Sequence, residues 1–481
     1  MVKIQSVKVN FIMNAILTGS TFIFPLITFP YISRVLQPAG VGKVNFASSV
    51  VYYFSMFAML GVPTYGIRAC AKVRDDKEQL SRTVHEIFII NLLMGMVTYI
   101  VYFLLVAIVP KLQAEKTLYY IMSMVIFLNV VGVEWLYKGL EQYTYITIRS
   151  ILFKVLGLVL MFGLVKKSED YVFYGAITVI SGVGSNILNF FKLHKHIYLY
   201  PVGAYHIERH IKAIAVFFLM SVATTIYTNL DTIMLGFITN DTEVGYYTAA
   251  IKIKNILVSF VTALSTVLLP RVSYYIEHGM KEKFYKLTQK ALNFIFLSAL
   301  PLVVYFIVFA KESIILLSGI EFSGAILPMQ IITPSILFIG LTNVLGIQVL
   351  VPLGQEKKVF YSVLVGAIID LIINIVCIPP FVSSGASVGT VVAEFFVLLV
   401  QIWFLKEQIP LVFGDVQLKK IITGISCGLF GVYWIKYLQI PEFFVLIASG
   451  GLFFIIYGLI LVFTKEKFVC SIIFELKQKR K

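Results

Sequence analysis

Fourteen apolar runs, each long enough to cross a bilayer as a helix, follow one another along the 481 residues of this chain. A spanning helix needs about 20 apolar residues. The runs are continuous rather than alternating, so they predict helices and not the strands of a membrane barrel. They lie near residues 11–31, 44–66, 84–109, 117–137, 147–165, 171–190, 211–236, 244–269, 290–310, 326–351, 360–380, 386–405, 419–437 and 441–463.

Composition supports the same class of protein. Hydrophobic residues make up 59% of the chain and charged residues 14%, whereas a soluble domain averages about 45–50% apolar and about 25% charged. These values exclude a soluble enzyme, a disordered chain and a secreted disulfide scaffold. The loops between the runs are too short for a soluble domain, so we expect function to reside within the helices or at their ends.

The basic residues predict the orientation in the membrane. The net charge is +15, which in a soluble protein would suggest a nucleic-acid partner. With the N-terminus in the cytoplasm, 29 of the 40 Lys and Arg residues lie on the cytoplasmic side and 8 on the outer side. This bias predicts an even number of spans, both termini in the cytoplasm, and basic loops that contact anionic lipid rather than nucleic acid.

Short repeats suggest two related halves. The segment VGKVNFA (residues 41–47) matches VGYYTAA (244–250), and GLEQYTYI (139–146) matches PLGQEKKV (352–359), each at the start of corresponding predicted spans. A shift of six spans preserves orientation, so the repeats are parallel. We expect an all-α integral membrane protein with an N-lobe (1–210, helices 1–6), a C-lobe (211–410, helices 7–12), two further helices (411–463) and a basic cytoplasmic tail (464–481).

A few charged residues lie deep in the predicted spans, where each costs about 2.5–3.5 kcal/mol if it faces lipid. They are Lys154, Asp231, Lys252, Lys254, Asp370 and Glu394. Arg149 and Glu134 lie near the cytoplasmic ends of their spans, and Arg34 lies just past the outer end of the first. Two explanations fit these charges: they surround a hydrated cavity between the lobes, or they form intramembrane pairs, for example Asp231 with Lys252.

Proline and helical geometry add detail to this picture. Pro25 and Pro30 fall within the first span, where each removes a hydrogen bond and bends the helix. This predicts either a bending gate helix or a static kink. Arg149 and Lys154 are five residues apart and so about 140° apart around a helix. At most one of the two can point directly toward the cavity.

Sequence signatures of enzymes and metal sites are absent. No HExxH, GxSxG or Walker A motif occurs, and the four cysteines form no CxxC pair. His206 and His210 have the spacing of metal ligands, but no nearby acid or cysteine completes a set, so the sequence favours a solvated basic loop. We therefore expect no catalytic activity, no metal and no cofactor.

The chain resembles the polysaccharide flippases called Wzx, of the multidrug/oligosaccharidyl-lipid/polysaccharide exporter superfamily. The similarity extends to about residue 463. It rests on FPYISRVLQPAGVG (29–42), LGVPTYGIRACAK (60–72), YTNLDTIMLG (227–236), VGYYTAAIKI (244–253) and PLGQEKK (352–358).

This resemblance implies two six-helix lobes around a basic cavity with alternating access. The implied cargo is a polysaccharide repeat unit on undecaprenyl pyrophosphate, for capsule or O-antigen, moved to the outer leaflet of the bacterial cytoplasmic membrane. Implied partners are membrane lipids and the polysaccharide polymerase machinery. Basic residues would hold the diphosphate by charge-assisted hydrogen bonds. The residues expected to do so are Arg34, Arg149, Lys154, Lys252 and Lys254.

The energy source and two rival functions stay open at this point. The membrane potential alone could drive an anion outward, or Asp231, Asp370 and Glu394 could carry H⁺ or Na⁺ inward. A multidrug-type antiporter of the same fold is the main alternative, although its cationic cargo favours acids over bases deep in the spans. A polysaccharide polymerase or glycosyltransferase would need a larger outer loop or an outer pair of catalytic acids.

Overall fold

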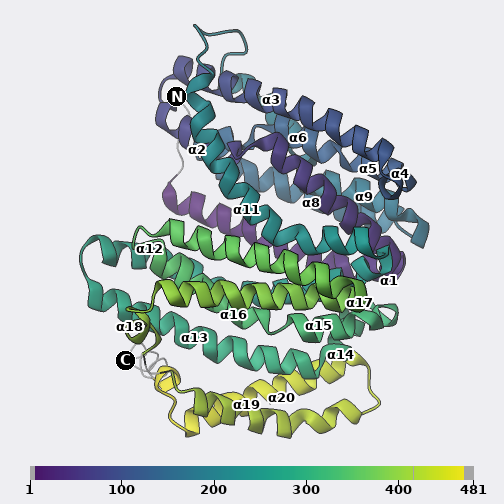
Figure 1. Cartoon of the computed structure of the whole chain (residues 1–481), viewed down its shortest axis with the longest axis vertical. Helices are drawn as coiled ribbons and strands as arrows, with labels where there is room; N and C mark the ends of the chain where they lie inside the picture. Colours follow the sequence, from purple (N-terminus) through teal and green to yellow (C-terminus); the bar gives the residue numbers. More distant parts are fainter. Residues whose placement is uncertain (1–5, 415, 471–481) are drawn as a thin grey trace. The chain divides into compact units, whose positions relative to one another are not determined.

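The computed structural model describes residues 6–414 and 416–470, and these residues form helices without a single strand (Figure 1). The predicted basic tail lies outside the described residues from position 471 onward. The first half contains α1 (Val7–Met59), α2 (Val62–Val73), α3 (Lys77–Ile108), α4 (Pro110–Ala114), α5 (Lys116–Met122), α6 (Met124–Gly132), α7 (Glu134–Gly139), α8 (Tyr143–Leu164), α9 (Tyr171–Val179), α10 (Asn186–Lys192) and α11 (Glu208–Ile238). The second half contains α12 (Asp241–Glu277), α13 (Lys281–Val308), α14 (Ala310–Ser318), α15 (Ile326–Ile332), α16 (Ser335–Thr342), α17 (Glu356–Phe404), α18 (Ile409–Phe413), α19 (Leu418–Val432) and α20 (Glu442–Phe463).

Several of these helices are membrane spans by length and composition. Among the described residues, seven helices are long and apolar enough to cross a bilayer, or up to ten if each bent helix pair is one span. Two of the seven, around α1 and α17, are long enough to cover two predicted spans each. The all-helical membrane class is therefore confirmed, while the count of fourteen spans stays a prediction.

Contacts divide the chain into two compact units, Met1–Gly245 (unit 1) and Tyr246–Lys481 (unit 2). In unit 1, α1 packs against α3, α6, α8 and α11, while α2 packs against α3 and α7. Among these helices, α3 and α6 run side by side (Figure 1). The predicted lobe boundary at residues 210 and 211 stays a prediction.

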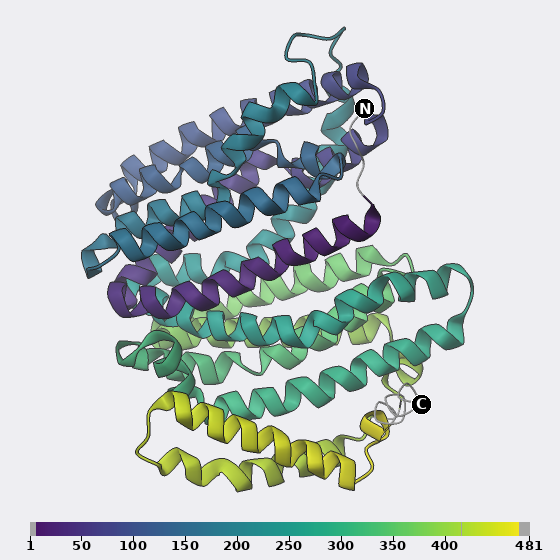
Figure 2. The same cartoon turned by 180° about the vertical axis from the view of Figure 1, so that it is seen from behind.

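In unit 2, α17 packs against α15 and α16, and α13 packs against α16 and α19. The antiparallel pair of α19 and α20, drawn in yellow, forms an apolar cluster with α13 that includes Tyr305, Phe453 and Tyr457 (Figure 2). Gly424 and Gly428 lie directly against the rings of Tyr457 and Phe453. A larger side chain at either glycine would separate the two helices.

Within α1 the backbone leaves the helical conformation at Gln37, and bending at Pro25 and Pro30 stays a prediction. Gln37 has φ 60° and ψ 173°, and the proline that follows it also disfavours the helical conformation at this position. Pro38 also lacks the N–H that would bond the carbonyl of Arg34. The side-chain amide of Gln37 donates to that carbonyl instead, at 3.0 Å.

Two further breaks lie near prolines. The segments Ile320–Ile332 and Ser335–Leu350 meet at 46° beside Pro334. In α17 the helical conformation is interrupted at Val382, with φ 44°, just after Pro379 and Pro380. Val133, with φ 38° and ψ 38°, separates α6 from α7 without a proline. This turn places the short helix α7 against α2, which matters for the site below.

Candidate functional site

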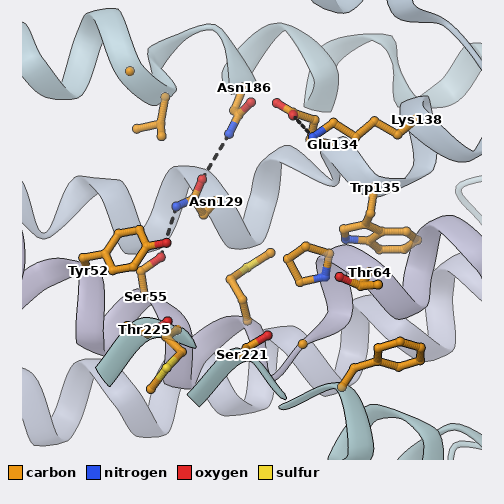
Figure 3. A pocket seen from close by; sticks show the side chains of 17 residues that line it. Tyr52, Ser55, Thr64, Asn129, Glu134, Trp135, Lys138, Asn186, Ser221 and Thr225 are labelled. Carbon is orange, nitrogen blue, oxygen red and sulfur yellow. Dashed lines mark hydrogen bonds and ion pairs between the residues drawn. The ribbon is translucent and has the colours of Figure 1, made fainter. Parts of the chain in front are cut away.

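A cavity of about 670 Å³ lies within unit 1, between α1, α2, α6, α7, α11 and the segment that leads into α10 (Figure 3). Its polar and aromatic lining residues are Tyr52, Ser55, Thr64, Asn129, Glu134, Trp135, Lys138, Asn186, Phe217, Ser221 and Thr225. Glu134 and Lys138 are the charged members of the lining. A volume of this size is typical of pockets for small organic ligands, which span about 300–1,000 Å³.

Amide side chains form the uncharged part of the wall. Asn129 donates from Nδ2 to the hydroxyl oxygen of Ser55 at 3.1 Å, and its Oδ1 accepts from Asn186 Nδ2 at 3.4 Å. Both bonds are drawn in Figure 3. The three residues come from α1, α6 and α10, so this short chain of hydrogen bonds links three separate helices.

The charged part continues from Asn186. Arg149 is 2% exposed and donates to Asn186 Oδ1 at 3.0 Å, to Ser185 Oγ at 2.6 Å and to Glu134 Oε2 at 2.7 Å. The other carboxylate oxygen of Glu134 accepts from Lys138 at 2.8 Å. Glu134 is thus paired with both Arg149 and Lys138. Arg149 does not line the cavity, but it bonds two residues that do, Glu134 and Asn186.

Trp135 is the buried aromatic residue of the lining. It is 2% exposed, and its indole N–H has no hydrogen-bond acceptor among the described residues. That nitrogen has almost no accessible surface, so protein atoms enclose it. Leaving a buried N–H without an acceptor costs about 1–3 kcal/mol, so this arrangement calls for an explanation.

Two glycines set the shape of the wall. A Cβ at Gly66 would lie 2.6 Å from Cε3 of Trp135, and a Cβ at Gly132 would lie 2.5 Å from Cβ of Asn186. Side-chain carbon atoms do not approach that closely. The positions of Trp135 and Asn186 therefore both depend on a neighbour without a side chain. Gly182, in contrast, lines the cavity with no atom within 4 Å of its Cβ position.

The structure separates the predicted basic residues of unit 1. Lys154 donates to Ser20 Oγ at 2.6 Å, and so points to α1, whereas Arg149 points to α7 and α10. This difference agrees with their angular separation on α8. Arg34 is exposed and donates to the carbonyl of Pro30 at 2.6 Å. None of the three lines the cavity, and their role in binding stays a prediction.

The remaining predicted residues lie on α11, α12 and α17. Asp231 is 9% exposed on α11. In unit 2, Lys252 and Lys254 are half-buried on α12, while Asp370 and Glu394 are 2% and 8% exposed on α17. Asp370 lies close to Gly389 across the break in α17, where a Cβ would be 3.0 Å from Oδ1. Pro25 and Pro30 lie within α1, and their gating role likewise stays a prediction.

The prediction of a solvated loop at His210 is wrong. This ring is 4% exposed, and its Nε2 lies 2.7 Å from Oε2 of Glu86, while Nδ1 lies 2.6 Å from the hydroxyl of Tyr65. Arg209 donates to the same carboxylate at 3.0 Å. Glu86 is more than 100 positions away in the sequence, so the spacing of the histidines could not reveal it. No three His, Cys, Asp or Glu residues within 6–414 and 416–470 could hold a metal ion.

The sequence alone does not identify Glu134, Lys138, Trp135, Asn129 and Asn186 as site residues. Lys138 is one of the 29 basic residues that the charge bias places on the cytoplasmic side, and uncharged polar residues give no comparable signal within an apolar span. One signal in the sequence could have indicated the site. Trp135, one of three tryptophans in the chain, lies next to Glu134 and three positions before Lys138.

Comparisons with known proteins agree on the fold. A family model described as polysaccharide biosynthesis protein matches residues 7–276, and a model named MatE matches residues 217–376. The "Putative O-antigen transporter" of Escherichia coli (strain K12) is 24% identical over 406 residues, which cover 84% of this chain and 97% of that protein.

Two solved structures share the arrangement of helices. The lipid II flippase MurJ in an inward closed conformation has a TM-score of 0.75 at 16% identity, and the match covers 95% of this chain and 99% of that one. An inward-facing multidrug resistance transporter of the MATE family has a TM-score of 0.59 at 14% identity, covering 81% and 94%. At these identities the similarity establishes the fold.

Proposed function

Because the chain belongs to the polysaccharide biosynthesis protein family, we propose that it is a flippase for a lipid-linked saccharide. Its cargo is a polysaccharide repeat unit on undecaprenyl pyrophosphate, which it moves from the inner to the outer leaflet of the cytoplasmic membrane. The E. coli relative named for O-antigen transport and the fold shared with a lipid II flippase support this proposal.

The observation that carries the proposal is the hydrogen-bonding wall of the cavity in unit 1. A diphosphate and a hydrated saccharide cannot cross about 30 Å of hydrocarbon without replacement of their hydrogen bonds. Asn129, Asn186 and Ser55 supply hydrogen-bonding groups, and Lys138 supplies a cation. The lipid tail stays in the bilayer, since withdrawing each CH₂ would cost about 0.8 kcal/mol.

Lys138 is the residue best placed to bind the diphosphate. Glu134 is bonded to both Lys138 and Arg149. When a phosphate oxygen replaces Glu134 as the partner of Lys138, Glu134 keeps its bond to Arg149. The buried Arg149 therefore stays paired. The predicted phosphate contacts of Arg34, Arg149, Lys154, Lys252 and Lys254 belong to the same proposal, with Arg149 acting through Glu134 and Asn186.

Two energy sources fit this mechanism. Moving two phosphate charges outward gains about 4–5 kcal/mol at 100 mV, from about 2.3 kcal/mol per charge. Alternatively, Asp231 on α11 and the buried acids Asp370 and Glu394 on α17 carry H⁺ or Na⁺ inward. In either case Pro25 and Pro30 would let α1 bend as the cavity changes its access.

A cation antiporter of the same fold is the second candidate, and the match of residues 217–376 to MatE favours it. Its cationic cargo would need an acid available in the cavity. Glu134, the acidic lining residue, already bonds two bases. The saccharide cargo therefore fits the cavity better.

The test is transport of lipid-linked saccharide by the full chain in vesicles, combined with deletion of the gene. Deletion should leave a lipid-linked glycan in the inner leaflet. Lys138→Ala should abolish transport, whereas Lys116→Ala, an exposed lysine away from the cavity, should not. Normal export after deletion, or full transport by Lys138→Ala, would contradict the proposal.

A further inference from the structure

The loop between α10 and α11, residues 193–207, exposes two adjacent large side chains, Leu199 at 64% and Tyr200 at 62%. We propose that this loop is an interfacial anchor for anionic phospholipid. Leu199 and Tyr200 insert among the lipid headgroups, and the bases around them bind the lipid phosphates. This inference concerns the contact of unit 1 with the membrane and does not depend on the cargo.

Contacts with the first turns of α3 support the exposed tip of the loop. The N–H of Tyr198 donates to Ser81 Oγ at 2.9 Å, and the carbonyl of Val202 accepts from Arg82 at 3.1 Å. Residues 199–201 lie between these two contacts. They therefore form a tip that is fixed at both ends and directed away from the protein.

Two further contacts continue along α3. The hydroxyl of Tyr205 lies 3.0 Å from Nδ1 of His85, and the N–H of His206 donates to Glu86 at 2.7 Å. Earlier in the loop, Ile197 is turned inward and is 1% exposed. The loop thus buries one apolar side chain and holds its backbone in place, so the exposure of Leu199 and Tyr200 belongs to a defined conformation.

The tip lies beside the helices of unit 1. In both views the loop stands out to the side of α3 rather than beyond its end (Figures 1 and 2). Because α3 is long and apolar enough to cross a bilayer, the space beside it holds lipid. Phe190 and Phe191, on the last turn of α10, are 46% and 66% exposed just before the loop begins. The tip therefore lies over the leaflet on the side predicted to be cytoplasmic.

Charge indicates which lipid the loop binds. The loop contains no Asp or Glu. Lys77 lies 4.4 Å from the ring of Tyr198, which stacks on the ring of Tyr200 at 5.1 Å. Aromatic rings beside bases are typical of a membrane interface, where the bases attract anionic lipid. The bases in and around the loop are Lys77, Arg82, Lys192 and Lys195. The sideways position of the tip favours lipid over a cytoplasmic protein as the partner.

Tryptophan fluorescence can locate the tip in the full-length protein. Replacing Trp403 and Trp434, which are 66% and 56% exposed, by Phe leaves the buried Trp135 as a constant background. Leu199→Trp is then made in this protein, and the protein is placed in vesicles of phosphatidylglycerol and brominated phosphatidylcholine. Bromine on the acyl chains quenches a tryptophan that contacts them. Asp75→Trp is the matched control, because Asp75 is exposed in the turn that precedes α3.

We expect quenching of the added tryptophan in Leu199→Trp and in a second variant, Tyr200→Trp, but not in Asp75→Trp. Each base near an anionic surface shifts such an insertion equilibrium about fivefold. Adding Lys195→Ala should therefore lower the ratio of inserted to free loop about fivefold, and vesicles without phosphatidylglycerol should lower it further.

Three results would overturn the inference. Unquenched emission from both Leu199→Trp and Tyr200→Trp would show that the tip stays in water, as it would if its partner were a cytoplasmic protein. Equal quenching in Leu199→Trp and Asp75→Trp would show that the tip makes no special contact. Equal quenching with and without phosphatidylglycerol would show that the bases select no anionic lipid.

Discussion

Gly42 and Gly245 make a reciprocal backbone contact within unit 1. A Cβ at Gly42 would lie 2.7 Å from the carbonyl carbon of Asp241, and a Cβ at Gly245 would lie 2.7 Å from that of Pro38. Asp241 precedes Gly245 by four residues, and Pro38 precedes Gly42 by four residues. The two glycines are the second residues of the matching segments 41–47 and 244–250, so equivalent glycines of the predicted repeat lie against each other.

This contact predicts that neither glycine tolerates a methyl group. Gly42→Ala should lower the free energy of unfolding by about 1–3 kcal/mol, the usual range for overpacking, because the carbonyl of Asp241 belongs to a helix and cannot move alone. The measurement is thermal unfolding of the purified protein in detergent. Gly163→Ala is the matched control, since Gly163 lies in a helix with nothing within 4 Å of its Cβ position. Equal melting temperatures for the two variants would contradict the prediction.

The sequence predicts the fold well because the apolar runs are long. The helical membrane class and the resemblance to polysaccharide flippases, carried by residues such as Phe29–Gly42, are confirmed by the structure and the family match. The residues of the candidate site could not be predicted from the sequence in the same way. Lys138 reaches the cavity because Val133 adopts a left-handed conformation that redirects α7. Valine rarely adopts a positive φ, so the sequence does not predict this turn. Glu86 and His210 are 124 residues apart in the sequence, so their spacing does not predict that they form a pair.

Glu134 should contribute to stability, whereas Lys138 should contribute to transport. Glu134→Gln leaves Arg149, which is 2% exposed, without its acid. We expect a loss of about 1–3 kcal/mol, less than the about 3–5 kcal/mol for breaking a fully buried pair, because the Glu134 side chain is one-third exposed.

Lys138→Met is the matched variant, since it removes the other partner of the same carboxylate. It should change the melting temperature little, because the pair that it breaks is partly exposed, and it should abolish transport in vesicles. A Lys138→Met protein that unfolds as early as Glu134→Gln would show that both residues are structural.

Gly182→Leu should close the cavity while the fold is retained. The position lines the cavity and has open space at its Cβ, so the new side chain projects into the cavity rather than into a neighbour. Transport of lipid-linked saccharide should be lost with an unchanged melting temperature. Gly163→Leu adds the same side chain away from the cavity and should transport normally. Normal transport by Gly182→Leu would mean that the cargo passes elsewhere.

The Glu86 cluster should fix the start of α11. Glu86 has 0% exposure and bonds Arg209, His210 and the backbone N–H of His206 at 2.7 Å. Glu86→Ala leaves the buried His210 and the half-exposed Arg209 without their acid, so we expect a loss of about 2–4 kcal/mol of unfolding free energy. Glu208→Ala removes an exposed acid that lies 3.4 Å from His206 and should change stability by less than about 0.5 kcal/mol. Faster amide hydrogen exchange at the first turns of α11 in Glu86→Ala alone would locate the effect, and equal exchange in both variants would contradict it.

Asp370→Asn should distinguish the two energy sources. Asp370 is 2% exposed on α17 beside Gly389, and the change to Asn preserves its shape while removing the charge. If Asp370 carries an inward ion, transport driven by a Na⁺ or H⁺ gradient at zero potential disappears in the variant. Transport driven by the membrane potential alone persists, because the charge that moves is that of the diphosphate. Vesicles with independently set ion gradients and potential measure both. Glu407→Gln, an exposed acid in the segment after α17, is the control and should respond to every gradient as the unaltered protein does. An Asp370→Asn protein that keeps its full response to the ion gradients would exclude Asp370 from coupling and leave Asp231 and Glu394 as the candidate ion carriers.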